Sequence, residues 1–285
     1  MQQMPELTVT SEIYNEYDYH TKISPTNEGN VISEFPFVLA KQTTAAKFDK
    51  DNDLDVVRPK KEVIKIEHSS KTKLALVGLQ VWRGAFLLAD LITHLGIKGE
   101  LINKTVLELG AGTGLTSFAA ALYAKKVVCT DINVGGILEL IKLNAKYNDK
   151  LIKSQFKVMP LDFMDINWSQ ELTDEIRDVD IVIAADVIYD DDVTAAFVRT
   201  IDKIMNTNPP KTIYIALEKR YVFTIEHLDS VAPCYETFLT LLNKDKMDDV
   251  VYNWTVQEMS LDFPKYFTYD RVKELVLWKI SSKPS

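Results

Sequence analysis

The sequence predicts an α/β fold in which a mainly parallel, Rossmann-like sheet carries helices on both faces. From about Thr105 onward, apolar strand-like segments alternate with helix-like segments, the pattern of strands joined by crossover helices. The first of these strands runs into a glycine turn, GAGTG at 110–114, which opens the first helix. Near the end, residues 250–260 and 272–280 have strand character and a short connection, so we expect the sheet to finish in an antiparallel pair.

Five predicted strands form the parallel part of the sheet: 104–109, 125–131, 156–163, 179–186 and 211–219. The fourth, VDIVIAAD, has no polar alternation, which predicts a strand buried on both faces. Helices are predicted over 115–124, 135–148 and about 193–205, because their apolar residues recur at helical spacing.

The first hundred residues give weaker signals. Residues 1–60 are polar and interrupted by prolines, and we expect parts of them to be mobile. Residues 62–78 predict two strands around the turn HSSKT, and 78–95 predict a helix that begins just after Trp82. We therefore divide the chain into a partly irregular N-terminal extension, 1–62, and one domain, 63–285.

Composition narrows the class of protein. The 285 residues are 46% hydrophobic and 26% charged, as in an ordinary soluble globular protein. The net charge of −8 argues against direct nucleic-acid binding and suits an enzyme that acts on a basic protein segment. We find no apolar run near the ~18 residues of a membrane span and no signal peptide. We therefore expect an intracellular monomer without a membrane contact.

The two cysteines also point to a reducing compartment. Cys129 and Cys234 are far apart in sequence, so they build neither a disulfide framework nor a cysteine-rich zinc site, and we expect no metal. Cys129 stands in an apolar strand, which predicts a buried free thiol.

The segment Glu108–Gly114, ELGAGTG, is a candidate nucleoside-binding loop. Its first residues after the strand, Gly110, Ala111 and Gly112, allow a tight turn and a close approach of a ligand to the backbone. The alternative is a plain strand-to-helix turn. The spacing is GxGxG, whereas dinucleotide-binding loops have GxGxxG or GxGxxA, so a nicotinamide oxidoreductase is disfavoured. A nucleoside with a compact amino-acid tail, S-adenosylmethionine, fits better, with Glu108 organising the loop near its ammonium group.

Carboxylates at the ends of the next two strands extend this site. Asp131 ends the second strand, where it can accept hydrogen bonds from both ribose hydroxyls; alternatively, it caps the next helix. Asp162 and Phe163 follow the third strand. There they can bind the exocyclic amine and stack on the ring of an adenine, or they can be a turn residue and a core aromatic.

Several longer motifs carry a family resemblance. They are GLQVWRGA at 78–85, LELGAGTGL at 107–115, CTD at 129–131, LDF at 161–163 and AADVIYDDD at 184–192. Together they resemble the seven-strand, S-adenosylmethionine-dependent protein-lysine methyltransferases of the methyltransferase-16 family. The resemblance covers about residues 76–280 and implies a class I methyltransferase domain over 63–285. The strings QVWRGAFLLAD at 80–90 and LEKRYVFTIEHLD at 217–229 point to one subgroup. The family often has Trp where this chain has Phe163, a change that preserves stacking.

The resemblance also implies the catalytic residues. The family carries an acid-x-x-aromatic motif beside the methyl group, where the target lysine enters, and Asp186 and Tyr189 match it. Trp82 then walls the methyl end of the cofactor, although the residue alone suggests a core aromatic. Ala185 matches a small cofactor-contacting position. We expect the three aspartates at 190–192 only to complement the dipole of the next helix.

The chemistry suggests how this pair acts. A lysine must lose its proton before it can be methylated, which costs about 4.6 kcal/mol at pH 7 for a pKa near 10.4. A carboxylate alone favours the ammonium, so we expect Asp186 to capture and align the lysine. Tyr189 supplies an apolar wall and a hydroxyl. The nearby charges at 218–220 either shape the substrate entrance or form a solvated charge run.

The resemblance implies a protein-lysine N-methyltransferase whose partner is a protein substrate carrying the target lysine. The subgroup implies a nuclear nucleic-acid-binding protein as substrate and favours the nucleus, with the cytoplasm as the other compartment. The alternative is a non-catalytic adaptor that binds a protein or chaperone partner. The sequence alone identifies neither the target lysine nor the degree of methylation.

Overall fold

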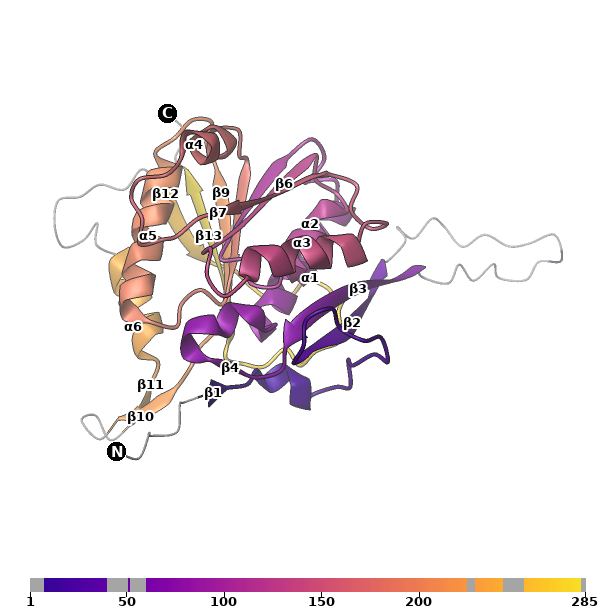
Figure 1. The fold of residues 1–285 in the computed structure, drawn as a ribbon. Helices are drawn as coiled ribbons and strands as arrows, with labels where there is room; N and C mark the ends of the chain where they lie inside the picture. Colours follow the sequence, from indigo (N-terminus) through magenta and orange to yellow (C-terminus); the bar gives the residue numbers. More distant parts are fainter. Residues whose placement is uncertain (1–7, 40–50, 52–59, 225–228, 243–253, 283–285) are drawn as a thin grey trace.

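A computed structural model describes residues 8–39, 51, 60–224, 229–242 and 254–282. Its centre is a seven-stranded sheet (Figure 1). In spatial order the strands are β7 (Gln155–Pro160), β6 (Lys126–Asp131), β5 (Thr105–Leu109), β8 (Ile181–Ala185), β9 (Thr212–Glu218), β13 (Leu275–Ser282) and β12 (Trp254–Glu258). The first five are parallel, and β13 is antiparallel to both β9 and β12. β13 is therefore the single reversed strand of this sheet, and the predicted antiparallel pair is confirmed.

Within the described residues, three α-helices cover each face of the sheet. α1 (Arg83–Ile97), α2 (Leu115–Ala121) and α3 (Ile137–Tyr147) lie on one face, where Val106 and Val127 point. α4 (Gln170–Arg177), α5 (Asp191–Met205) and α6 (Pro233–Leu242) lie on the other, where Leu107 and Val128 point. Strands β5 and β8 are thus buried on both sides, as was predicted for β8 from its unbroken apolar sequence. Cys129 is a buried free thiol.

The sequence reasoning missed α4 and α6. α4 is short and mostly polar, and although its two buried residues, Leu172 and Ile176, stand at helical spacing, two apolar positions are too few to identify a helix from the sequence. Its start has a usable signal, because the Ser169 hydroxyl caps the helix by accepting from the backbone N–H of Leu172 at 3.1 Å. α6 follows a two-stranded ribbon, β10 (Val222–Thr224) and β11 (Asp229–Val231).

The two strands predicted around the turn within residues 62–78 are confirmed only in part, because the second is very short and the two do not pair with each other. β3 (Lys60–Ser69) pairs along its whole length with β2 (Asn30–Leu39), in the register Asn30↔Ser69 to Leu39↔Lys60. The segment after the turn forms only the short β4 (Thr72–Lys73) and then a 3-10 helix, η2 (Leu74–Leu79). The sequence LALVGL has no polar residue, so periodicity could not separate a strand from a helical turn.

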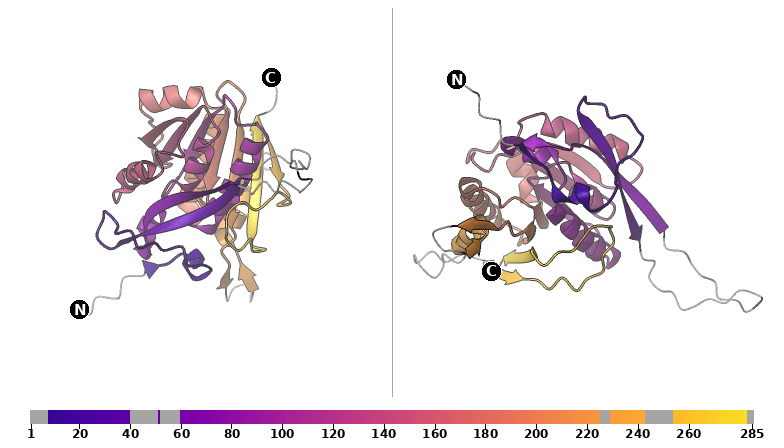
Figure 2. Two further views of the ribbon diagram at one scale, coloured as in Figure 1. Left: turned by 90° about the vertical axis from the view of Figure 1, so that its right-hand side faces the viewer. Right: turned by 90° about the horizontal axis from the view of Figure 1, so that it is seen from below.

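The described part of the N-terminal region is integrated into the fold. β1 (Thr8–Val9) pairs with β4, and η1 (Glu12–Asn15) follows it. The long β2–β3 hairpin stands apart from the central sheet (Figure 2), and Phe35 of β2 packs edge-on against Phe86 of α1 at 5.0 Å. The expected mobility of parts of 1–60 falls partly on residues outside those described. The division at 62/63 stays a prediction, although the hairpin spans it.

One described segment, 74–97, is long and apolar enough to cross a membrane, contrary to the expectation from the sequence. The structure divides it into two pieces. η2 ends at Leu79, the backbone is extended at Gln80 and Trp82, and α1 begins at Arg83. α1 then packs in the core of the protein, with the buried Asp90 paired to Arg271 at 2.7 Å.

Candidate active site

A cavity of about 220 Å³ lies where the carboxyl ends of β5, β6, β7 and β8 meet η2. Strand carboxyl ends are where open α/β sheets bind ligands. All eleven residues singled out from the sequence line it: Trp82, Glu108, Gly110, Ala111, Gly112, Asp131, Asp162, Phe163, Ala185, Asp186 and Tyr189. η2 forms a further wall of the cavity and has no buried residue. The sequence analysis did not identify this wall, because it predicted a strand where the structure has η2.

The glycine loop is tightly wound between β5 and α2. Gly110, Gly112 and Gly114 all have positive φ, a region that other residues enter only at a cost. At Gly112 a side chain would also come within 3.0 Å of the Gly78 carbonyl oxygen in η2. Glycine is therefore required here for conformation and for the close approach of the loop to η2.

The Asp131 carboxylate holds this loop in place. One oxygen accepts from the N–H of Gly112 at 2.7 Å and the other accepts from the N–H of Ile132 at 2.7 Å. Burial raises the pKa of Asp131 to about 6, although these two hydrogen bonds favour the carboxylate and lower the pKa. The alternative that Asp131 caps the next helix is wrong, because α3 follows Gly136 and has no side-chain cap. Each oxygen keeps acceptor capacity for a ligand hydroxyl.

Glu108 is buried at the end of β5, with 1% of its surface exposed. It accepts a hydrogen bond from the Ser117 hydroxyl of α2. Burial raises its pKa to about 8, because the loss of hydration outweighs the hydrogen bonds that favour the carboxylate. Without a ligand, Glu108 is therefore mostly protonated at pH 7.

Replacing Glu108 by glutamine should flatten the dependence of stability on pH. Between the ordinary glutamate pKa of 4.5 and the raised pKa of about 8, the folded protein keeps a proton that the unfolded chain has lost, so stability falls as pH rises through this window. We expect Glu108→Gln to gain roughly 2–5 kcal/mol relative to wild type between pH 5 and pH 8.5. Urea unfolding at several pH values measures this. Asp131 is present in both proteins, so parallel curves would contradict the assignment.

Asp162 and Phe163 make the structural contacts considered from the sequence and also line the cavity, while their binding of adenine stays a prediction. The Asp162 carboxylate accepts from the N–H of Met164 at 2.8 Å, which shapes the turn after β7. The Phe163 ring packs at 5.2 Å from Phe197 of α5 and is half-buried. Both residues also line the cavity, so each has a structural contact and a surface that faces a ligand.

The charge of this cavity selects among ligands. Its acidic lining residues are Glu108, Asp131, Asp162 and Asp186, and none of the described lining residues is Lys, Arg or His. Such a lining repels a pyrophosphate and attracts a cation that carries hydroxyl and amino groups. It therefore fits S-adenosylmethionine, with its sulfonium and ammonium groups, and not a dinucleotide. Within the described ranges, no group of three or more His, Cys, Asp or Glu side chains is arranged to hold a metal ion.

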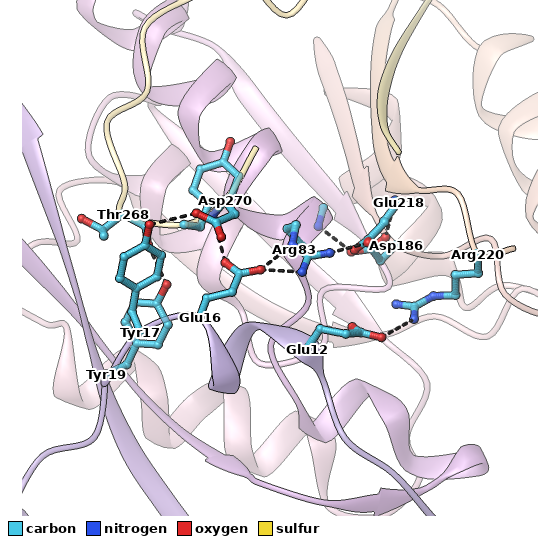
Figure 3. Close-up of polar contacts among 12 residues, drawn as sticks. Glu12, Glu16, Tyr17, Tyr19, Arg83, Asp186, Glu218, Arg220, Thr268 and Asp270 are labelled. Atoms are coloured by element: carbon cyan, nitrogen blue, oxygen red, sulfur yellow. Dashed lines mark hydrogen bonds and ion pairs between the residues drawn. The ribbon is translucent and has the colours of Figure 1, made fainter. Parts of the chain in front are cut away.

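Asp186 lies directly after β8 with φ +53°, a left-handed conformation that is uncommon for a residue other than glycine. Its carboxylate accepts from the N–H of Gly84 at 2.6 Å and from the N–H of Glu218 at 2.9 Å (Figure 3). It thus joins the end of β8 to the start of α1 and the end of β9. Burial raises its pKa, while Arg220 and the two amides oppose that shift.

Gly84 is a functional position that the sequence reasoning missed. A side chain there would come within 2.5 Å of an oxygen of Asp186, so only glycine lets the first turn of α1 approach this carboxylate. The sequence did offer a signal for this position. Glycine is a poor helix former, so a glycine in the first turn of a predicted helix indicates that another part of the structure requires it.

A second cavity, of about 300 Å³, adjoins the first. Four lining residues are common to both: Val77, Trp82, Asp186 and Tyr189. The indole N–H of Trp82 donates to the Val77 carbonyl at 2.9 Å, which fixes the ring between the cavities. Tyr189 is 38% exposed. The predicted catalytic pair therefore lies on the wall between an acidic nucleoside-sized cavity and a second, more open approach.

Asp190 differs from Asp186 in its role. Its carboxylate caps α5 by accepting from the N–H of Val193 at 3.0 Å, and Asp191 and Asp192 lie in the first helical turn. The expectation that these three aspartates serve the helix is consistent with this geometry.

Comparison with known proteins places the chain in a family. The family model described as lysine methyltransferase matches residues 59–233. The chain is 37% identical over 240 residues to methyltransferase-like protein 22 of Mus musculus, covering 78% of this chain and 60% of that protein. It is 31% identical to the Homo sapiens protein of the same name, covering 90% and 76%. It is also 31% identical to protein-lysine N-methyltransferase EFM3 of Chaetomium thermophilum, covering 57% of this chain and 46% of that protein.

These findings confirm the resemblance drawn from the motifs, including the subgroup, which is that of methyltransferase-like protein 22. The matched residues contain the glycine loop, Asp131, Asp186 and Tyr189. The sheet, with five parallel strands and one reversed strand between β9 and β12, has the class I methyltransferase arrangement. The chain spans 60% of the length of the mouse relative. The chain belongs to the lysine methyltransferase family.

Proposed function

We propose that this protein is a protein-lysine N-methyltransferase that uses S-adenosylmethionine. The observation that carries the proposal is the meeting of two cavities at Asp186 and Tyr189. One cavity is lined by carboxylates and apolar groups and suits a cationic nucleoside. The other reaches the same two residues from a different side, as an acceptor lysine must.

The residues of the first cavity divide by chemistry. Asp131 binds the ribose hydroxyls, while Asp162 and Phe163 receive the adenine. Glu108 and the loop Gly110–Gly112 face the amino-acid end, where a cationic ligand favours the ionised form of Glu108. Trp82 and Ala185 border the reactive end. S-adenosylmethionine, when bound, supplies a methyl group on a sulfonium sulfur that is displaced in line by a neutral amine.

The chain itself orients the acceptor. Both oxygens of Asp186 are held by backbone amides, so the carboxylate has one fixed direction in which to align an incoming lysine. Tyr189 and Trp82 provide walls that exclude water and disfavour the charged ammonium. The proton leaves to water through the second cavity. Alignment at about 3–3.5 Å supplies most of the rate gain.

The finer assignments rest on the subgroup. We propose a nuclear nucleic-acid-binding protein as the substrate, bound without direct contact of this chain with nucleic acid, and the nucleus as the main compartment. A net charge of −8 suits a basic acceptor segment. The monomeric state and a chaperone partner stay predictions.

The test is transfer of labelled methyl groups from S-adenosylmethionine into proteins of a cell lysate, with a reaction lacking the protein as control. We expect label in one or a few proteins, recovered as methylated lysine after hydrolysis. Label on another residue type would overturn the lysine assignment. Tight binding of S-adenosylhomocysteine without any transfer would favour the adaptor.

A further inference from the structure

The second cavity has a wall that comes from outside the central sheet. Val9, Thr10 and Glu12 line it, and none of them lines the first cavity. They belong to the N-terminal segment, which we define as residues 8–16. The acceptor side of the site is therefore built partly from a segment that the sequence analysis assigned to an extension.

Two buried polar groups hold this segment in place. The Gln80 side chain accepts from the N–H of Ser11 at 2.9 Å and donates to the Val9 carbonyl at 3.1 Å. The Tyr14 hydroxyl accepts from the N–H of Val81 at 2.8 Å. Both partners lie just before Trp82, so the segment is fixed against the residues that separate the two cavities.

An ion-pair clamp adds a third attachment. The buried Arg83 guanidinium bonds Glu16 of the segment at 2.7 Å and also contacts Glu218 at the end of β9 (Figure 3). Glu218 in turn donates its N–H to Asp186. The segment is thus connected through two side chains to the predicted catalytic carboxylate. Such a well-partnered contact keeps the wall in one position.

A second arginine, Arg220, lies outside this clamp and lines the second cavity. Arg220 lies over the Trp82 ring at 4.6 Å and pairs with Glu12 at 3.7 Å, and both side chains are partly exposed. The positive charge of Arg220 is the strongest influence that lowers the pKa of Asp186 and so favours its ionised form, and the negative charge of Glu12 opposes it. The titratable and charged groups around this point are Glu12 from η1, Arg83 from α1, Asp186 and Tyr189 after β8, and Glu218 and Arg220 at the end of β9.

We propose that Val9, Thr10 and Glu12 of the N-terminal segment form part of the acceptor site, and that the Glu12–Arg220 pair sets the charge that the target lysine meets there. The proposal rests on the proposed function. Asp186 attracts the ammonium but also stabilises it, which opposes loss of the proton. Arg220 offsets this negative field beside Trp82 and disfavours the ammonium once it is aligned. Glu12 holds Arg220 in place and limits its effect.

The proposed role of the N-terminal segment as a wall of the acceptor site is tested by introducing a larger side chain into that wall. Thr10→Trp fills the second cavity, whereas Thr8→Trp, two residues away on the same exposed segment, does not line it. We expect Thr10→Trp to reduce labelling of lysate proteins at least tenfold and to leave the affinity for S-adenosylhomocysteine within threefold of wild type. Thr8→Trp should label as wild type does. If wild type transfers methyl groups and Thr10→Trp does so equally well, this inference fails while the proposed function stands.

The role of the Glu12–Arg220 pair is tested by measuring kcat as a function of pH. The substrate is the acceptor protein identified in the lysate experiment, used at a saturating concentration. We expect Arg220→Gln to move the rising limb of kcat to higher pH by about half to one unit, and Glu12→Gln to move it to lower pH. Arg220→Lys should restore most of the wild-type profile. A purely structural role would lower kcat equally at every pH in both variants. That result, shifts in the same direction, or a parallel loss of S-adenosylhomocysteine affinity would overturn the inference.

Discussion

Asp186→Asn should reduce methyl transfer by at least about a hundredfold. The substitution keeps the size of the side chain but removes the charge that aligns the acceptor amine, and misplacement by about 1 Å can cost that much in rate. The structure adds a second effect. Asp186 accepts from the amides of Gly84 and Glu218, so asparagine must present its NH₂ group to one of these donors. We therefore also expect a loss of about 1–3 kcal/mol in stability.

Three measurements separate these effects. Methyl transfer, S-adenosylhomocysteine affinity by calorimetry and the free energy of unfolding are compared for wild type, Asp186→Asn and Asp190→Asn. Asp190 caps α5, and asparagine is an equally good cap, so its variant should lose no more than ~1 kcal/mol and keep its turnover. Affinity of Asp186→Asn should stay within a few-fold of wild type. Full turnover in that variant, or affinity and rate that fall together, would exclude the acceptor-side role.

Asp131→Ala should weaken binding of S-adenosylhomocysteine by one to two powers of ten. The carboxylate is the proposed acceptor for the ribose hydroxyls, and loss of a charged hydrogen bond costs roughly 1.5–3 kcal/mol. The variant also frees the N–H of Gly112, because Asp131 holds the glycine loop at 2.7 Å. A drop in the melting temperature of the ligand-free protein should therefore accompany the loss of affinity.

A modified ligand distinguishes ribose recognition from loop damage. An analogue of S-adenosylhomocysteine without the two ribose hydroxyls should bind wild type much more weakly than the parent compound, and should bind Asp131→Ala about as well as the parent does. An equal preference for the parent in both proteins would assign Asp131 a loop-holding role only. NAD serves as a control, since the acidic lining should exclude its pyrophosphate in either protein.

The central sheet and the first cavity could be predicted from the sequence because their signals are local. Unbroken apolar runs identify buried strands, and the glycine spacing identifies a turn. Once the strands are parallel, their carboxyl ends share one edge, which brings Asp131, Asp162 and Asp186 together without knowledge of any contact. Residues at strand ends are thus predictable even when far apart in sequence.

The remaining part of the site depends on contacts without a local signal. Asp186 is held by Gly84, 102 positions away, and Arg83 pairs with Glu16, 67 positions away. No period or spacing relates such residues. The segment Leu74–Leu79 was misassigned because an entirely apolar run fits a strand and a helical turn equally well. The N-terminal wall of the second cavity also has no local signal, because the segment that forms it is held by contacts with Gln80, Val81 and Arg83.

The Arg83 clamp also bears on the order in which the protein becomes competent during synthesis. The glycine loop and Asp131 are translated early, whereas Glu218 and Arg220 follow much later. Asp270, whose N–H donates to Glu16 across 254 positions, is translated later still. Contacts of such separation carry the largest loop-closure cost and form late. The nucleoside half of the site can therefore be assembled on a growing chain before the acceptor half. A chain that is cut or stalled before β9 lacks Glu218 and Arg220, and therefore lacks one partner of Arg83 and the cationic lining residue of the second cavity.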